Sequence, residues 1–337
     1  MSATRLLASS LVLASIATAA DDGKVVNVYS ARHYDTDLAL YERFEERTGI
    51  RVNLIEGGSD GLIERIVNEA EFSPADLLIT VDAGRLWRAQ QAGVFQAVDS
   101  AVLTERIPAH LRDPGGHWFG LSKRARVIVY NKAAGLPDGI SRYEDLADPR
   151  LVGKVCMRSS GNIYNLSLLG SLIEHNGKES ASEWANGVVA NFRRQPQGND
   201  TAQLRAVAAG ECEVSIANTY YIGRLLGTDD PQERAVVDGL GVLFPNQDDR
   251  GAHVNISGAG VTRHAPHRDN AVGFLEYLTS DGAQRLFAEG NNEYPVVGPA
   301  SGPIAALGEF KEDAVNAAVL GANQSQAVKA YDRAGWR

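Results

Sequence analysis

The chain has 337 residues, of which 44% are hydrophobic and 22% are charged, a balance that is ordinary for a soluble globular protein. This length is long for one compact core and comfortable for two. The formal net charge of -9 excludes the basic surface that nucleic-acid binding requires, and it is compatible with a cationic ligand.

The first 19 residues have the pattern of a secretory signal peptide. Arg5 supplies the positive start, an apolar run follows it, and Ala17-Thr18-Ala19 offers the small residues of a cleavage site. The alternative is an N-terminal membrane anchor, but the apolar run is short for a membrane span. We therefore expect residues 1–19 to be removed and the mature protein to be exported and not embedded in the membrane.

Strand and helix patterns alternate along the mature chain. Apolar, β-branched runs predict strands at 24–31, 50–57, 75–82, 153–160 and 212–219. Helical periodicity predicts helices at 38–49, 61–73, 84–93, 141–148, 165–177, 181–192, 201–210 and 267–290. The segment 117–132 predicts a long strand pair or a crossover strand, and the segment 241–264 predicts a strand, a loop and a second strand. Two amphipathic pieces close the chain. This alternation is typical of parallel sheets that are covered by helices on both faces.

The predicted fold is α/β with two lobes, each a mostly parallel sheet flanked by helices. Because no flexible linker separates the halves, crossover strands near 121–126 and 252–257 are the expected hinges. We expect an N-terminal lobe of 20–121 plus about 254–292 and a C-terminal lobe of 122–253. Helices within 293–337 would then pack back on both lobes.

Four of the 11 tyrosines follow predicted strands directly: Tyr34, Tyr164, Tyr220 and Tyr221. Ligands of open α/β sheets bind outside the carboxyl ends of strands, so these positions are candidates for a binding site. Three other tyrosines lie within predicted strands or helix faces and are expected to be core residues: Tyr41, Tyr130 and Tyr277.

Phenolate oxygen is a hard anionic donor, suited to a hard cation such as ferric iron. Coordination to a strongly charged ion deprotonates groups that are otherwise neutral. Residue chemistry alone leaves other interpretations open. A single tyrosine at a strand end often stabilises a loop by hydrogen bonding, and adjacent tyrosines also suit sugar stacking.

The two cysteines, Cys156 and Cys212, form either one disulfide or two buried thiols. Neither follows the signal segment, so no lipid-attachment cysteine is expected there. An enzyme is disfavoured because the chain lacks the nucleophile elbow, the zinc-protease motif and the phosphate loop. The glycine-rich run 57–61 opens a helix, which is more typical of a plain turn than of an anion site.

Several long motifs occur in an order that is specific to one group of proteins. They lie at 29–37, 79–86, 120–132, 158–165, 210–225 and 253–261. Through them the chain resembles the ferric-iron-binding periplasmic proteins of bacterial ABC importers, in their tyrosine-rich subgroup. The resemblance implies the type II periplasmic-binding-protein fold, Fe³⁺ as the transported ligand and no organic cofactor. It further implies a monomer that delivers iron to an ABC-type permease and its ATPase in the inner membrane. The alternative is the same fold binding a polyamine, a sugar or an organic anion.

The resemblance also implies which residues hold the metal. Carried over by position, the ligands are Tyr34, Tyr164, Tyr220 and Tyr221, with His33 as a further candidate. Fe³⁺ with four phenolates carries one negative charge, which is costly to bury without compensation. Arg124 and Arg224 are expected beside the site, where a guanidinium lowers the pKa of nearby phenols. A disulfide between Cys156 and Cys212 would brace the lobe that supplies three of these ligands.

Overall fold

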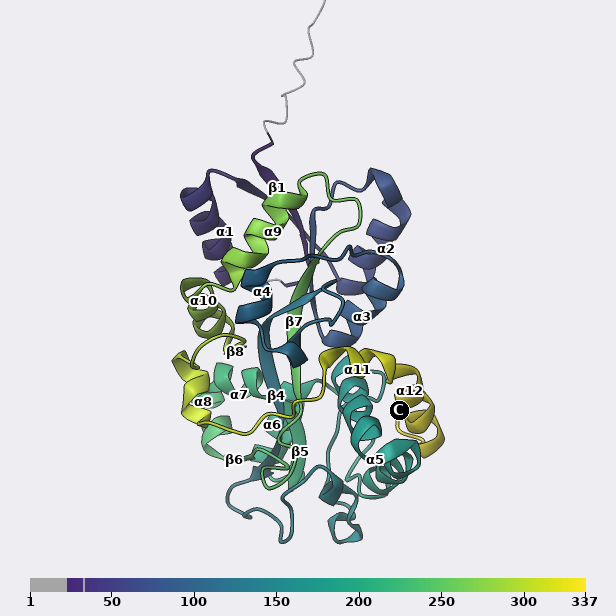
Figure 1. The fold of residues 1–337 in the computed structure, drawn as a ribbon. Helices are drawn as coiled ribbons and strands as arrows, with labels where there is room; N and C mark the ends of the chain where they lie inside the picture. Colours follow the sequence, from purple (N-terminus) through teal and green to yellow (C-terminus); the bar gives the residue numbers. More distant parts are fainter. Residues whose placement is uncertain (1–22, 33) are drawn as a thin grey trace, which may run out of the picture.

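The computed structural model describes residues 23–32 and 34–337 and shows two lobes, one above the other in Figure 1. Two of the expectations above, the signal peptide at 1–19 and the ligand His33, lie outside the described residues. In the part of the chain that the structure covers, every helix is too short or too polar to cross a membrane.

The first lobe opens with the expected parallel strands. β1 (Val25–Ser30) pairs in parallel with β2 (Arg51–Glu56) and with β3 (Leu77–Val81). β1 and β3 are almost entirely buried because helices cover both faces, whereas the edge strand β2 is partly exposed. The helices that follow these strands are α1 (Asp35–Thr48), α2 (Ser59–Glu69) and α3 (Ala83–Gln91).

One long strand connects the two lobes. β4 (Phe119–Asn131) pairs through its first half with β7 (Val254–Val261) and through its second half with β5 (Val214–Asn218) and β6 (Leu240–Leu243). The change of partner falls between Ala125 and Arg126. The short β8 (Tyr294–Pro295) also pairs with β4, and the sheet order is β2-β1-β3-β7-β4-β5. β4 and β7 run through the middle of the molecule in Figure 1.

The sheet is therefore mixed, which differs from the expected mostly parallel sheet in each lobe. Parallel pairing between strands is found for β1, β2 and β3, whereas β4 meets each of its four described partners antiparallel. The cause is the shared strand itself, since β4 enters the second lobe directly from the first without a crossover helix. The lobe boundaries at residues 121 and 253 stay a prediction.

The second lobe differs from the sequence prediction in two local respects. The segment 153–160 is not a strand, and Val155 alone forms bridges, with Phe192 and Val214. The two helices predicted at 165–177 and 181–192 are both present within α5 (Ile163–Ala190), which is broken at Gly177, where φ is 81°. The helix expected at 141–148 is a single 3-10 turn, η3 (Glu144–Ala147).

The remaining elements cover the sheet and connect the lobes. The α-helices are α4 (Ala101–Arg106), α6 (Asp200–Ala208), α7 (Thr219–Leu226), α8 (Pro231–Asp238), α9 (Arg268–Leu278), α10 (Asp281–Asn291), α11 (Ala317–Ala322) and α12 (Gln324–Ala334). The 3-10 turns are η1 (Ala70–Phe72), η2 (Ala109–Leu111), η4 (Pro149–Leu151) and η5 (Gly302–Leu307). α11 packs on α3 of the first lobe and on α5 of the second, so the C-terminal segment contacts both lobes.

Each lobe has buried aromatic residues that fix its helices. In the first lobe, the ring of Phe274 on α9 lies 4.8 Å from the ring of Phe44 on α1. In the second lobe, Trp336 near the C-terminus is 1% exposed and lies 4.6 Å from the ring of Tyr331. Its indole nitrogen donates to the carbonyl of Arg158, so the C-terminus stabilises the loop that leads to Tyr164.

Candidate metal centre

The four candidate tyrosines all lie where a helix begins. Tyr34 is the N-cap residue of α1, and Tyr164 is the second residue of α5. Tyr220 and Tyr221 are in the first turn of α7, directly after β5. A strand that ends at a helix start brings a side chain to the ligand-binding edge of an α/β sheet. The prediction that the ligand tyrosines follow strands therefore holds for Tyr34, Tyr220 and Tyr221. Tyr164 instead follows a loop, because the segment 153–160 is not a strand.

Three of these tyrosines, one from the first lobe and two from the second, line one cavity between the lobes. The cavity has a volume of about 170 Å³. Its lining consists of Ala31, Arg32, Tyr34, Val81, Arg124, Tyr164, Tyr220 and Glu293. The hydroxyl of Tyr220 donates a hydrogen bond of 3.1 Å to the hydroxyl of Tyr164. Tyr221 packs beside Tyr220, with ring centres 4.2 Å apart, and is not part of this lining.

Burial determines the protonation of these phenols in the metal-free protein. Loss of solvation raises the pKa of Tyr34 and of Tyr221 above the ordinary value, and it raises the pKa of the nearly enclosed Tyr220 further. All three are therefore neutral at physiological pH. A cation that binds them as phenolates must displace their protons, which only a strongly charged ion does near neutral pH.

The two predicted arginines occupy different environments. Arg124 on β4 lines the cavity, is 2% exposed and donates to the hydroxyl of Ser257. Its Nε is buried and has no hydrogen-bond partner among the described residues, and the guanidinium places a positive charge beside the cavity. Arg224 is exposed on α7, and its guanidinium lies 5.8 Å from the ring centre of Tyr221.

Sequence reasoning missed a buried ion pair beside Tyr34. Arg32 donates to Glu293 at 2.9 Å and to Asp37 at 2.8 Å, and its guanidinium lies 5.0 Å from the ring centre of Tyr34. The hydroxyl of Ser122 donates to the same Glu293 oxygen at 2.5 Å. Arg32 lies in the motif that precedes Tyr34, but arginine is usually exposed, so nothing in the sequence indicated that it is buried. Its partner Glu293 is 261 residues away in sequence, so the pairing was not visible either.

The N-cap of α5 fixes the position of Tyr164. The side-chain oxygen of Asn162 accepts a hydrogen bond of 3.1 Å from the backbone N–H of Tyr164. We expect Asn162→Ala to lower the free energy of unfolding by about 1 kcal/mol, the usual cost of a lost cap. Urea unfolding of the metal-free protein measures this change. Asn162→Ser, which retains a capping oxygen, should recover most of it, and equal stability of all three proteins would contradict the capping role.

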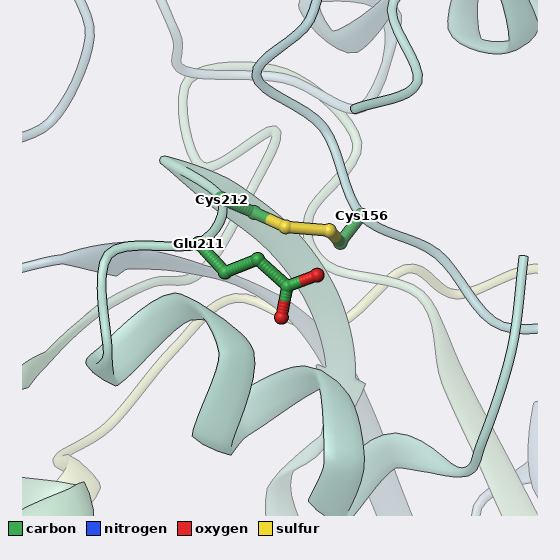
Figure 2. Close-up of side chains that lie close together, drawn as sticks. All are labelled: Cys156, Glu211 and Cys212. Atoms are coloured by element: carbon green, nitrogen blue, oxygen red, sulfur yellow. A yellow bond between two sulfur atoms is a disulfide. The ribbon is translucent and has the colours of Figure 1, made fainter. Parts of the chain in front are cut away.

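Cys156 and Cys212 form a disulfide in the second lobe, with Cα atoms 5.9 Å apart (Figure 2). The carboxylate of Glu211 lies beside the sulfurs, so the three side chains have the spacing of a metal site. Bonded sulfurs offer no thiolate, however, and Glu211 accepts a hydrogen bond of 2.6 Å from Arg194. This cluster is therefore a structural cross-link and not a second metal site.

Two lobes that share crossover strands and enclose a polar cavity define a solute-binding protein of the type II periplasmic class. Residues 72–311 match the family model described as bacterial extracellular solute-binding protein, and the chain belongs to that family.

Similar proteins have consistent names. Iron uptake protein A1 of Synechocystis is 51% identical over 96% of this chain and 91% of its own length. The Fe(3+)-binding periplasmic protein of Serratia marcescens is 31% identical over 98% of this chain and 96% of its own length. These relatives are named for iron binding or uptake and not as enzymes.

Solved structures of similar proteins agree with the fold. FutA of Trichodesmium, in complex with iron and citrate ligands, superposes with a TM-score of 0.91. It is 54% identical and covers 93% of this chain and 100% of its own. The ferric binding protein of Campylobacter jejuni has a TM-score of 0.85 and 40% identity, again over 93% of this chain and 100% of its own. The expected fold class is confirmed by these likenesses.

Proposed function

We propose that this protein binds ferric iron between its lobes and delivers it to an ABC importer. Tyr34 closes the metal from the first lobe, and Tyr164, Tyr220 and Tyr221 hold it from the second. His33, which precedes Tyr34, is a further candidate ligand. The protein acts in the periplasm as the substrate-binding component, with a permease and an ATPase of the inner membrane as its partners. It transports the metal and catalyses no reaction.

The convergence of phenol groups from both lobes on one cavity is the observation that carries this proposal. Tyr34 and the hydrogen-bonded pair Tyr164 and Tyr220 line the same space, beside the buried guanidinium of Arg124. Phenolates favour hard, highly charged cations, and the adjacent positive charge offsets the excess negative charge of a tyrosinate complex. The iron-related names of the similar proteins support the same ligand.

The alternative ligands fit this cavity less well. A polyamine needs carboxylates that are free to pair with its ammonium groups. Glu293 is the carboxylate of the described lining, and Arg32 and Ser122 already occupy one of its oxygens. A volume of about 170 Å³ is also small beside the usual range of pockets for organic ligands.

Addition of a soluble ferric chelate to the metal-free protein tests the proposal. We expect one equivalent of Fe³⁺ to produce an orange to red colour, because tyrosinate-to-iron charge transfer absorbs visible light. Bound iron should also raise the melting temperature, since a ligand that binds only the folded state stabilises it. Spermidine, glucose and citrate serve as the comparison ligands. A protein that stays colourless with iron and is stabilised by one of these would contradict the proposal.

A further inference from the structure

A buried side chain of the first lobe is hydrogen-bonded to a buried side chain of the second. Asp82, between β3 and α3, accepts a hydrogen bond of 2.8 Å at its Oδ1 from the hydroxyl of Ser167 on α5. Both residues are fully buried. Because water does not compete for a hydrogen bond in such a place, this contact joins the two lobes directly. We call it the interlobe bond.

Asp82 is fixed within the first lobe by three further hydrogen bonds. Its carboxylate accepts from the backbone N–H of Gly84 at 2.9 Å and from the side chain of Asn255 at 2.8 Å. Its own backbone N–H donates to the carbonyl of Ile256 at 2.9 Å. Asn255 and Ile256 belong to β7, which pairs with β3 and with the first half of β4. The carboxylate therefore moves with the first lobe and cannot follow Ser167 when the lobes separate.

The backbone of Asp82 has an unusual conformation. Its φ is 80° and its ψ is 126°, a combination that residues with a side chain rarely adopt. Such a conformation costs free energy and persists only where the surrounding contacts impose it. Glycine would adopt it without that cost, but it would offer no carboxylate to α3 or to Ser167. The strain at this position therefore points to a role for the side chain.

The interlobe bond lies beside the proposed metal centre. Val81, which precedes Asp82 in the chain, lines the cavity, and Ser167 follows Tyr164 by about one turn of α5. α3 itself packs on α5 near this point. The bond thus holds the start of α5, and with it Tyr164, against the lobe that carries Tyr34.

We propose that the hydrogen bond between Ser167 and Asp82 stabilises the closed arrangement of the lobes and so determines how fast the bound metal leaves. It is formed where Tyr34 and Tyr164 line one cavity, and opening breaks it because Asp82 is fixed to β7. A contact that exists only in the closed state shifts the equilibrium toward that state. Asp82 and Ser167 are positioning residues, since neither lines the cavity. This role rests on the proposed ferric-iron function and names the contact that controls release.

Replacement of Ser167 by Ala tests the proposal. We expect Ser167→Ala to release Fe³⁺ to an excess of EDTA about three to ten times faster, the effect of losing one ordinary hydrogen bond. The association rate constant should change little, because the metal enters the open form, in which the bond is already absent. Ser171→Ala is the matched control. Ser171 is also buried on α5 and donates to a carboxylate at 3.0 Å, that of Asp313 in the C-terminal segment. This control should release iron at the wild-type rate.

A double-mutant cycle with Asp82→Gly identifies the bond itself. Glycine suits the backbone conformation of Asp82, so this variant should fold, and it alone should accelerate release by a similar factor. If Ser167 acts through Asp82, Ser167→Ala should cause no further acceleration in the Asp82→Gly background. Additive effects, a wild-type release rate in Ser167→Ala or Asp82→Gly, or an equal acceleration in Ser171→Ala would overturn the proposal. Thermal melting of each metal-free variant confirms that it is folded.

Small-angle X-ray scattering separates a failure of this proposal from a failure of the proposed function. We expect metal-free Ser167→Ala to have a larger radius of gyration than metal-free Ser171→Ala, because its open form gains population. A wild type that gives no ferric colour would refute the proposed function. The scattering difference would then decide on the interlobe bond alone, and equal radii would overturn it.

Discussion

Tyr164→Phe should weaken ferric iron binding by more than about a hundredfold, a larger loss than that expected for a residue that only orients a ligand. The substitution removes one phenolate oxygen and the hydroxyl that accepts the hydrogen bond from Tyr220. Because Tyr164 is only partly buried, the metal-free protein should lose no more than about 1 kcal/mol, the usual worth of one hydrogen bond. Competition against a ferric chelator measures the affinity, and urea unfolding measures the stability.

Tyr277→Phe is the matched control for that experiment. Tyr277 lies on α9 in the first lobe, where its ring centre is 5.4 Å from that of Phe44, and it does not line the cavity. Removal of its hydroxyl should leave iron affinity unchanged. Wild-type affinity in Tyr164→Phe, or an equal loss in both variants, would contradict the assignment of Tyr164 as a ligand.

Removal of the disulfide should lower the free energy of unfolding by about 4 kcal/mol. Cys156 and Cys212 are 56 residues apart in sequence, and a cross-link over a loop of that length restricts the unfolded chain by about this amount. The bond joins the segment that leads to Arg158 and Tyr164 with the segment that enters β5 and leads to Tyr220. The double variant Cys156→Ala/Cys212→Ala, unfolded in urea without metal, measures the effect.

A reducing agent provides the control for the disulfide. It should destabilise the wild type by a similar amount and should leave the double alanine variant unaffected. Two titratable thiols in the denatured, unreduced wild type would show that the cysteines are not joined in solution. An unchanged unfolding midpoint in the double variant would contradict the bracing role even if the bond is present.

The sequence predicted the first lobe well because its strands are continuous apolar runs with helices between them. The same argument located the candidate tyrosines, since strand ends in such a lobe are ligand-binding positions. It failed at 153–160, where an apolar start suggested a strand. In the structure, Val155 alone bridges to its neighbours, and the following residues form the loop that carries Arg158. The strand propensity of the residues at 153–160 does not reveal that tertiary contacts hold this segment as a loop, so the sequence alone predicted a strand there.

The polar residues around the site were the least predictable part. Arg32 and Glu293, like Arg126 and Asp200, are ion pairs between distant parts of the chain. A single sequence gives no sign of which charged residues become buried, because each pair is stable inside only when both partners arrive together. The proposed ligands have a chemical signature at a predictable place, whereas their supporting charges are defined by the three-dimensional fold.

The shared strands are the expected hinge between the two lobes. β4 and β7 are hydrogen-bonded to each other in the first lobe, and β4 continues without a break into the second. Two hydrogen-bonded strands bend easily out of the plane of the sheet. They resist bending within that plane, because such bending stretches or compresses the hydrogen bonds between them. We therefore expect opening to be a rotation about these strands, and we expect each reclosure to return Tyr34 to the same place opposite Tyr164 and Tyr220. The affinity of the site then depends on the bending energy of thirteen residues of one strand as well as on its ligands.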